Sequence, residues 1–313
     1  MIVDAHCHVG DEKWEPPWFW DALSTFLAPR YGLSLEAMVK IMRSSWDPSG
    51  DTMVNSMNRA GVDRAIICVA DHGLVESQED AATPIEEINR LTYEMVKRHP
   101  GRLYFAVGVD PRRKNALEIM ETGVKEWGAK SLKLHPPTGW YPNDRMVYPL
   151  YEKCIELGIP VNFHTGPWYY PLRSKYAHPK HLEDVAVDFP QLTLHCTHSG
   201  DLFYMEMVGL ARVYRNIVLD LAAWQGWLRN SRSTAISFYK IMRFIMDMVG
   251  PRLMFASDWG GFKNDHAYCD WVKDFTEIPD WVKEAGIEFS KKELDGYLGG
   301  NALRLLNLEN EAT

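Results

Sequence analysis

The sequence predicts a single (β/α)8 barrel. Short apolar segments rich in β-branched residues recur along the chain, each followed by a segment of helical periodicity, which is the pattern of a parallel sheet. Eight such strand segments occur, the number that closes a barrel. The length of 313 residues suits one barrel with additions. We therefore expect one domain over residues 1–313, with an insertion after the first strand and a helical C-terminus.

The elements follow in order from this alternation. The predicted strands are residues 2–6, 64–69, 103–109, 131–135, 160–164, 192–198, 217–221 and 253–258. The clearest predicted helices are residues 84–98, 116–127, 147–157 and 233–248. Two stretches exceed what one βα unit needs: residues 11–60, with an aromatic and proline cluster and a helix near 35–43, and residues 165–180. Their aromatic richness argues against disorder, so both are interpreted as functional loops.

Composition excludes several classes of protein. Hydrophobic residues make up 46% of the chain and the formal net charge is −8, so an excess of Lys and Arg for binding nucleic acid or an anionic membrane is lacking. The five cysteines are widely spaced without a CxxC motif, which argues against a disulfide framework or a zinc knuckle. Neither a signal peptide nor a membrane helix is expected. We expect a cytoplasmic enzyme, and the aromatic material suggests a homodimer.

A His-Cys-His motif ends the first predicted strand. His6 and His8 are two residues apart, so on a strand their side chains share one face, with Cα atoms about 6–7 Å apart. Two imidazoles in this arrangement can bind one metal ion, although unrelated core or surface histidines are the alternative. Cys7 should point to the opposite side as a buried thiol rather than a ligand.

Three further polar residues each end an apolar strand where a loop begins. His164 ends the fifth predicted strand, His198 the sixth and Asp258 the eighth. In a barrel these are the C-terminal ends of the strands, where active sites form. Together with the His-Cys-His motif, they predict a group of polar side chains over the barrel mouth.

These motifs resemble the amidohydrolase superfamily, in the branch that contains aminocarboxymuconate semialdehyde decarboxylase. The matching segments are Asp4-Ala-His6-Cys-His8, Gly158-Ile-Pro-Val-Asn-Phe-His164-Thr-Gly166, His198-Ser-Gly200, Ser257-Asp258-Trp259 and Asn301-Ala-Leu-Arg-Leu-Leu306. The resemblance implies that the metal ligands are His6, His8, His164 and Asp258, and that His198 polarises the substrate or transfers a proton. Three imidazoles and a carboxylate suit one divalent ion, Zn²⁺ first, with Mn²⁺ or Co²⁺ as alternatives.

Candidate substrate contacts come from the fourth strand and the aromatic loops. Lys133 and His135 share one face of their strand, where two-metal superfamily members carry a carbamylated lysine; a substrate contact or a buried ion pair is the preferred role for Lys133. Trp168 and Trp259 suggest a flat, unsaturated substrate, with ordinary core packing as the alternative. Arg173, near Trp168, is a candidate clamp for a carboxylate, with a solvated loop residue as the alternative.

Two other histidines receive separate interpretations. His195 should point away from His198 and serve as a packing histidine with its hydrogen bonds satisfied. His72, after the second strand, is a candidate pocket residue.

Three function classes follow from these residues. The first is non-oxidative decarboxylation of a carboxylated aromatic or unsaturated acid. The second is hydrolysis of a lactone, amide or related bond, with Asp258 or His198 activating a water molecule. The third is a non-catalytic metal-binding barrel, against which the presence of His198 beside a complete ligand set argues. Decarboxylation is the preferred interpretation, with His198 and Asp258 as the catalytic residues and a small carboxylic acid as the substrate.

Overall fold

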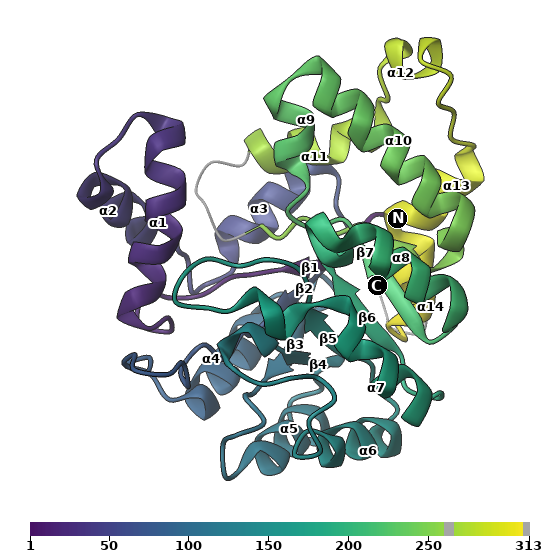
Figure 1. The fold of residues 1–313 in the computed structure, drawn as a ribbon. Coiled ribbons are helices and arrows are strands. Elements are labelled where there is room, and N and C mark those ends of the chain that lie inside the picture. Colours follow the sequence, from purple (N-terminus) through teal and green to yellow (C-terminus); the bar gives the residue numbers. More distant parts are fainter. Residues whose placement is uncertain (260–265, 309–313) are drawn as a thin grey trace.

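Eight parallel strands form the centre of the molecule. The computed structural model describes residues 1–259 and 266–308. Neighbouring strands pair in chain order: β1 (Val3–Cys7), β2 (Arg64–Cys68), β3 (Leu103–Gly108), β4 (Ser131–Leu134), β5 (Val161–His164), β6 (Leu194–Thr197), β7 (Ile217–Asp220) and β8 (Leu253–Met254). The main-chain N–H groups of Ala5 and Asp258 donate to the carbonyls of Phe255 and His6, at 3.0 and 2.9 Å, which joins β1 to the segment after β8. The predicted (β/α)8 barrel is confirmed (Figure 1).

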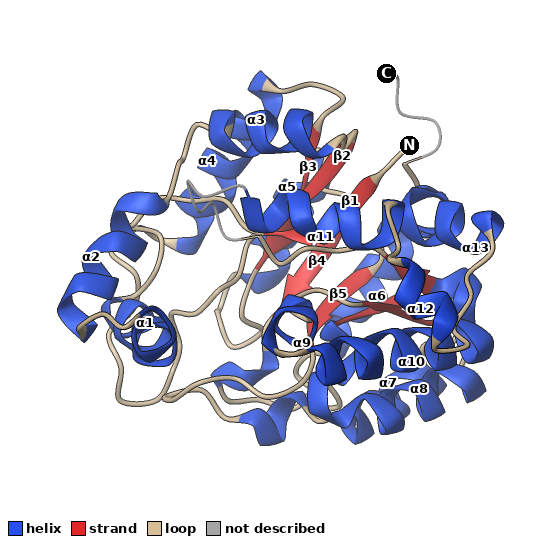
Figure 2. Ribbon diagram, turned by 90° about the horizontal axis from the view of Figure 1, so that it is seen from above, coloured by secondary structure: helices blue, strands red, loops and turns tan. Residues whose placement is uncertain are grey.

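Helices surround these strands (Figure 2). They are α1 (Pro17–Tyr31), α2 (Leu35–Ser45), α3 (Asp51–Ala60), α4 (Ile85–Arg98), α5 (Ala116–Lys125), α6 (Tyr148–Leu157), α7 (Glu183–Asp188), α8 (Tyr204–Val213), α9 (Gln225–Asn230), α10 (Arg232–Val249), α11 (His266–Thr276), α12 (Asp280–Glu284), α13 (Lys291–Asp295) and α14 (Asn301–Leu305). Short 3₁₀ turns are η1 (Pro136–Thr138), η2 (Ser174–Ala177), η3 (Pro179–Leu182), η4 (His198–Phe203) and η5 (Gly250–Arg252), and η6 (Gly296–Gly300) is a π-helical turn. In the described part of the chain, no helix is long and apolar enough to cross a lipid bilayer.

Alternation along the strands separates an apolar outer layer from a partly polar interior. In β4, Leu132 and Leu134 pack in the apolar layer that also contains the helix residues Ile119 and Leu150. Because strand side chains alternate, Lys133 faces the inside of the barrel. By the same alternation, the inward positions of β5, β6 and β7 include Asn162, His195 and Asp220.

A bulge in β1 determines where its histidines point. The pairing of β1 with β2 shifts register between Asp4 and Cys7. Ala5 packs in the barrel interior, whereas Cys7 lies in the outer layer, and its thiol contacts the carbonyl oxygen of Ile66 at 3.2 Å. A bulge adds one residue and re-aims the side chains that follow it, so His6 also faces inward. The prediction that Cys7 is a buried thiol facing away from the site is confirmed.

The C-terminal helix packs against the apolar part of the barrel interior. Ala302 in α14, together with Leu306 and Leu308 after it, belongs to one buried cluster with Ile66 and Met254. Burial of this apolar surface ties the end of the described chain to the strands that carry the site.

The insertion after β1 packs over one side of the barrel mouth. Helices α1 and α2 lie beside each other, outside the ring of barrel helices (Figures 1 and 2). Their buried residues, among them Phe19 and Met38, form one cluster with Val75 from the loop after β2 and Leu172 from the loop after β5. The two long loops predicted from the sequence therefore pack against each other.

Candidate metal centre

Two imidazoles and a carboxylate converge at the C-terminal end of β1. His6 Nε2 lies 3.1 Å from His8 Nε2, and the Asp258 Oδ1 atom lies 3.7 and 3.3 Å from these two nitrogens. His6 is fully buried, whereas the side chains of His8 and Asp258 are 24% and 21% exposed. The structure thus brings together three of the four predicted ligands, with an open side toward solvent.

His164 and His198 form a second part of the same site. The Nδ1 atom of His164, at the end of β5, lies 3.2 Å from His198 Nε2, and the rings of His198 and His6 are 5.2 Å apart. Two groups of ligand atoms within 4.8 Å of one another occur among the described residues: His6, His8 and Asp258, and His6, His198 and Asp220. His164 belongs to neither group, because its Nδ1 faces His198 instead.

The hydrogen bonds around these histidines determine which nitrogen carries a proton. A carbonyl oxygen only accepts, so His8 Nδ1, 2.8 Å from the carbonyl of Cys68, must carry the proton and leave a lone pair on Nε2. His198 Nδ1 likewise donates to the carbonyl of Ala222 at 3.0 Å. His198 Nε2 then accepts from His164 Nδ1, which leaves the lone pair of His164 on its Nε2.

This donor set fits a divalent cation. The lone pair of His8 Nε2 faces the Asp258 carboxylate and His6 Nε2 at short distance, an arrangement that a positive ion stabilises. His6 Nδ1 and His164 Nε2 are buried without a hydrogen-bond partner in the described structure. Unpaired buried polar atoms are costly, and a bound ion would satisfy the lone pair of His164 Nε2. An ion on His6 Nε2 leaves the proton on His6 Nδ1, whose nearest acceptor is Asp220 Oδ2 at 3.9 Å. Imidazole and carboxylate are ligands that Zn²⁺, Mn²⁺ and Co²⁺ accept.

Burial and charge keep the ligands in the protonation states that bind metal. Burial lowers the pKa of both His6 and His164, and the nearby Lys133 ammonium lowers them further, so both imidazoles stay neutral. Burial raises the pKa of the Asp258 carboxyl, but its contact with His8 and the neighbouring positive charges outweigh this effect, and the pKa lies below its usual value. His6 and His164 therefore bind as neutral imidazoles and Asp258 as an ionised carboxylate.

Two site residues adopt left-handed backbone conformations. Asp258 has φ of +56° and His198 has φ of +63°, values that non-glycine residues rarely adopt. The Asp258 N–H donates to the His6 carbonyl at 2.9 Å, and the His198 N–H donates to the Asp220 carboxylate at 2.7 Å. Such conformations cost about 1–3 kcal/mol each and persist where neighbouring contacts enforce them.

A row of polar side chains crosses the barrel interior beneath the site. Lys133 Nζ donates to Asn162 Oδ1 at 2.8 Å, Asn162 Nδ2 lies 3.1 Å from His195 Nδ1, and His195 Nε2 lies 2.7 Å from Asp220 Oδ2. His195 is thus fully hydrogen-bonded, as predicted, but it lies within the barrel. Lys133 Nζ also lies 3.3 Å from His6 Nε2, so an ion bound to this nitrogen would replace the contact with the ammonium.

Asn162 and Asp220 were not predicted from the sequence. Asp220 ends β7 as His164 ends β5, so the same signal, a polar residue that closes an apolar strand, identifies it. Asn162 lies within its strand, and only its inward position in the barrel reveals its role.

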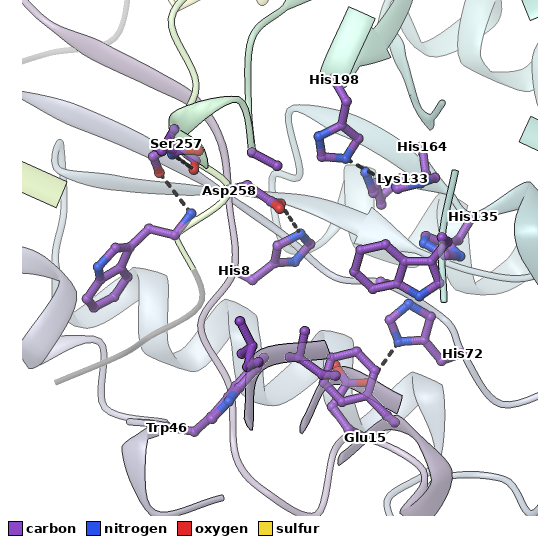
Figure 3. A pocket seen from close by; sticks show the side chains of 18 of the residues that line it. His8, Glu15, Trp46, His72, Lys133, His135, His164, His198, Ser257 and Asp258 are labelled. Atoms are coloured by element: carbon purple, nitrogen blue, oxygen red, sulfur yellow. Dashed lines mark hydrogen bonds and ion pairs between the residues drawn. The ribbon is translucent and has the colours of Figure 1, made fainter. Parts of the chain in front are cut away.

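A cavity of about 360 Å³ opens above the metal centre, a volume suited to a small ligand. Lys133 and His135 line it (Figure 3), as do Trp168 and Trp259. That these four residues contact the substrate stays a prediction. Burial lowers the pKa of His135, so this imidazole is neutral. The insertion supplies further lining residues that were not predicted, which are Glu15, Phe19, Leu23, Leu27 and Trp46.

Arg173 lies where the alternative of a solvated loop residue places it. It precedes η2 with an exposed side chain, is not part of the cavity lining, and its main-chain N–H donates to the carbonyl of Pro137 at 3.0 Å. Long cationic side chains keep their charged ends in water unless a buried partner holds them, which explains its position. Several loop tryptophans are also packing residues, since Trp224 is buried and stacks on Trp227 with ring centres 5.4 Å apart.

Comparison with known proteins identifies the family. A family model described as amidohydrolase matches residues 3–308. The chain belongs to the amidohydrolase family. It is therefore an enzyme of a metal-dependent family. No curated protein matches this amidohydrolase in sequence.

Solved structures share the fold of this amidohydrolase. An uncharacterised TIM-barrel protein from Bordetella bronchiseptica is 21% identical with a TM-score of 0.67, and the match covers 98% of each chain. An amidohydrolase from Burkholderia multivorans with bound zinc is 14% identical with a TM-score of 0.66, covering 98% of this chain and 99% of the other. 4-Oxalomesaconate hydratase from Rhodopseudomonas palustris is 18% identical with a TM-score of 0.58, covering 98% and 96%.

Proposed function

We propose that this amidohydrolase decarboxylates a carboxylated aromatic or unsaturated acid without an oxidant, using one divalent ion. Zn²⁺ is the first expectation, with Mn²⁺ and Co²⁺ as alternatives. The observation that carries the proposal is a cavity with an ion-binding donor set at one end and aromatic side chains along its walls. Such a cavity suits a flat molecule with a negatively charged end.

The residues of the centre have distinct roles in this reaction. His6, His8, His164 and Asp258 would hold the ion, which supplies positive charge to bind and polarise the substrate's carboxylate oxygens. The faces of aromatic side chains on the cavity wall would orient the unsaturated part of the substrate.

His198 is the proposed proton donor. Its Nδ1 is fixed on the carbonyl of Ala222, so Nε2 is the nitrogen that exchanges protons, and to do so it must give up the hydrogen bond that it accepts from His164 Nδ1. When protonated, Nε2 would transfer its proton to the substrate carbon that bears the carboxylate. The bond between this carbon and the carboxylate then breaks, CO₂ leaves, and the bonding electrons stay on the carbon. His198 regains a proton from solvent.

Hydrolysis of a lactone or amide is the second candidate function. The observation that favours it is the partly exposed Asp258 carboxylate at the cavity, whose pKa lies below its usual value. An ionised carboxylate in this position can accept a proton from an attacking water molecule.

Isotope incorporation distinguishes the two reactions. Metal-loaded protein is incubated with hydroxybenzoates and muconate-like acids in D₂O, and with lactones and N-acyl amino acids in H₂¹⁸O. The proposal predicts release of CO₂ and one solvent deuteron on carbon in the product, with much slower turnover of lactones and amides. Cleavage of a lactone or amide with ¹⁸O in the product acid, and no CO₂ from any acid, would overturn it. Arg173→Ala serves as the control, since its exposed side chain is outside the cavity and turnover should not change.

A further inference from the structure

A carboxylate–imidazole pair lies on the cavity wall away from the metal centre. Glu15 precedes α1 in the insertion, and His72 follows β2. Glu15 Oε2 lies 2.7 Å from His72 Nδ1, and the two side chains are only 11% and 6% exposed. An ionised carboxylate only accepts hydrogen bonds, so His72 Nδ1 carries the proton and its Nε2 presents a lone pair.

This lone pair has no partner within the protein. His72 Nε2 is buried and makes no hydrogen bond in the described structure. The imidazole is held in place because it stacks on Phe19, with ring centres 5.2 Å apart and planes inclined by 23°, while Trp18 contacts it edge-on. A buried acceptor left unpaired is costly, so a ligand that donates a hydrogen bond here removes that cost.

A row of histidine rings connects the Glu15–His72 pair to the metal centre. His72, His135, His164 and His198 follow one another along one wall, with successive ring centres 4.6, 4.6 and 4.7 Å apart (Figure 3). One imidazole ring, that of His135, therefore lies between His72 and the predicted ligand His164. A small substrate whose carboxylate is at the metal centre can reach the pair with its far side.

We infer that Glu15 and His72 bind a hydroxyl group on the part of the substrate distant from its carboxylate. This inference rests on the proposed decarboxylation and specifies its substrate as a hydroxylated acid. A hydroxyl hydrogen can be donated to the His72 Nε2 lone pair. A second carboxylate is disfavoured because it meets that lone pair and the negative charge of Glu15, and an apolar group leaves Nε2 unpaired.

Binding measurements with matched acids test the inference without turnover. Zinc-loaded wild-type protein, His72→Phe and Glu15→Gln are titrated calorimetrically with 3-hydroxybenzoate, 4-hydroxybenzoate and benzoate. In the wild type, at least one hydroxy acid should bind about tenfold tighter than benzoate, the value of one well-placed hydrogen bond. His72→Phe should abolish this preference and leave benzoate affinity nearly unchanged. Glu15→Gln, which no longer fixes the His72 tautomer, should reduce the preference.

Leu23→Ala is the matched control, because Leu23 lines the same cavity without a polar group. It should weaken all three acids by similar factors and preserve their ratio. A hydroxyl preference that persists in both His72→Phe and Glu15→Gln, or its absence from the wild type, would overturn the inference. A preference that depends on His72 without any CO₂ release would support this inference and contradict decarboxylation. CO₂ release at equal rates from hydroxylated and unsubstituted acids would support decarboxylation and contradict this inference.

Discussion

At the scale of single residues, the chemistry of the centre depends on where protons lie on the histidines. The carbonyl of Ala222 holds the proton of His198 on Nδ1, and His198 in turn holds that of His164 on its Nδ1. His164 Nε2 is left as a buried lone pair without a partner in the described structure. The carbonyl of Ala222 thus determines, through His198, which nitrogen of His164 is free to bind a metal ion.

Replacement of His198 separates proton transfer from metal binding. His198→Ala should retain about one ion per chain, because His6, His8 and Asp258 remain. Turnover should fall about 10²–10⁴-fold, the usual contribution of a general acid. Elemental analysis and CO₂ release measure the two quantities. His178→Ala is the control, since His178 pairs with Glu206 away from the cavity. Loss of the ion together with turnover would instead make His198 a ligand.

The residues located from the sequence lie at or just after the end of an apolar strand, whereas the missed Glu15 and Asn162 do not. His164 ends an apolar strand, and His198 and Asp258 follow one closely, so periodicity alone assigns them to the barrel mouth. Glu15 lies in an irregular segment before α1, where no periodicity relates it to the barrel. Its proximity to His72 arises from packing of the insertion, a long-range contact. For Arg173 the sequence left two positions open for the same reason, since the local sequence pattern does not determine in which direction a loop side chain points.

At the scale of elements, close packing of helix on strand is tested at a glycine in α5. A Cβ atom at Gly123 would lie 2.7 Å from Val107 Cγ2 in β3. The branched Val107 side chain is buried and cannot yield, so Gly123→Ala should destabilise the fold by about 1–3 kcal/mol despite its better helix propensity. Urea unfolding measures the change.

Gly209 in α8 is the matched control. A Cβ atom there meets nothing within 4 Å, so Gly209→Ala should stabilise by about 0.5–1 kcal/mol through helix propensity alone. Equal effects of the two substitutions would show that the contact between α5 and β3 is not close-packed.

Element positions were largely predictable, whereas irregularities within them were not. The four clearest predicted helices match α4, α5, α6 and α10 to within two residues. The eighth strand was predicted over residues 253–258, but the regular strand β8 covers only Leu253–Met254. The residues after it, which end in Asp258 with its left-handed backbone, do not continue the regular strand pairing. The bulge in β1 was also missed, since an apolar pattern does not reveal one extra residue.

At the scale of the whole molecule, some parts of the fold stabilise the barrel and others form the site. The outer apolar layer and the C-terminal helix stabilise the barrel, the inward polar residues of β4 to β7 support the centre from below, and the insertion closes the cavity from one side. The barrel follows from alternation of strands and helices in the sequence. How the insertion packs does not, because it depends on contacts between segments far apart in the chain.

The central claim is that a divalent ion binds between His6, His8 and Asp258. An anomalous difference map, from crystals of the protein as purified and measured at the zinc, manganese and cobalt edges, tests it most directly. The account predicts one peak per chain, within about 2–2.2 Å of His6 Nε2, His8 Nε2 and an Asp258 carboxylate oxygen, with His164 Nε2 turned toward it. No peak at this position for any of the three metals, or a peak bound only by other residues, would contradict it.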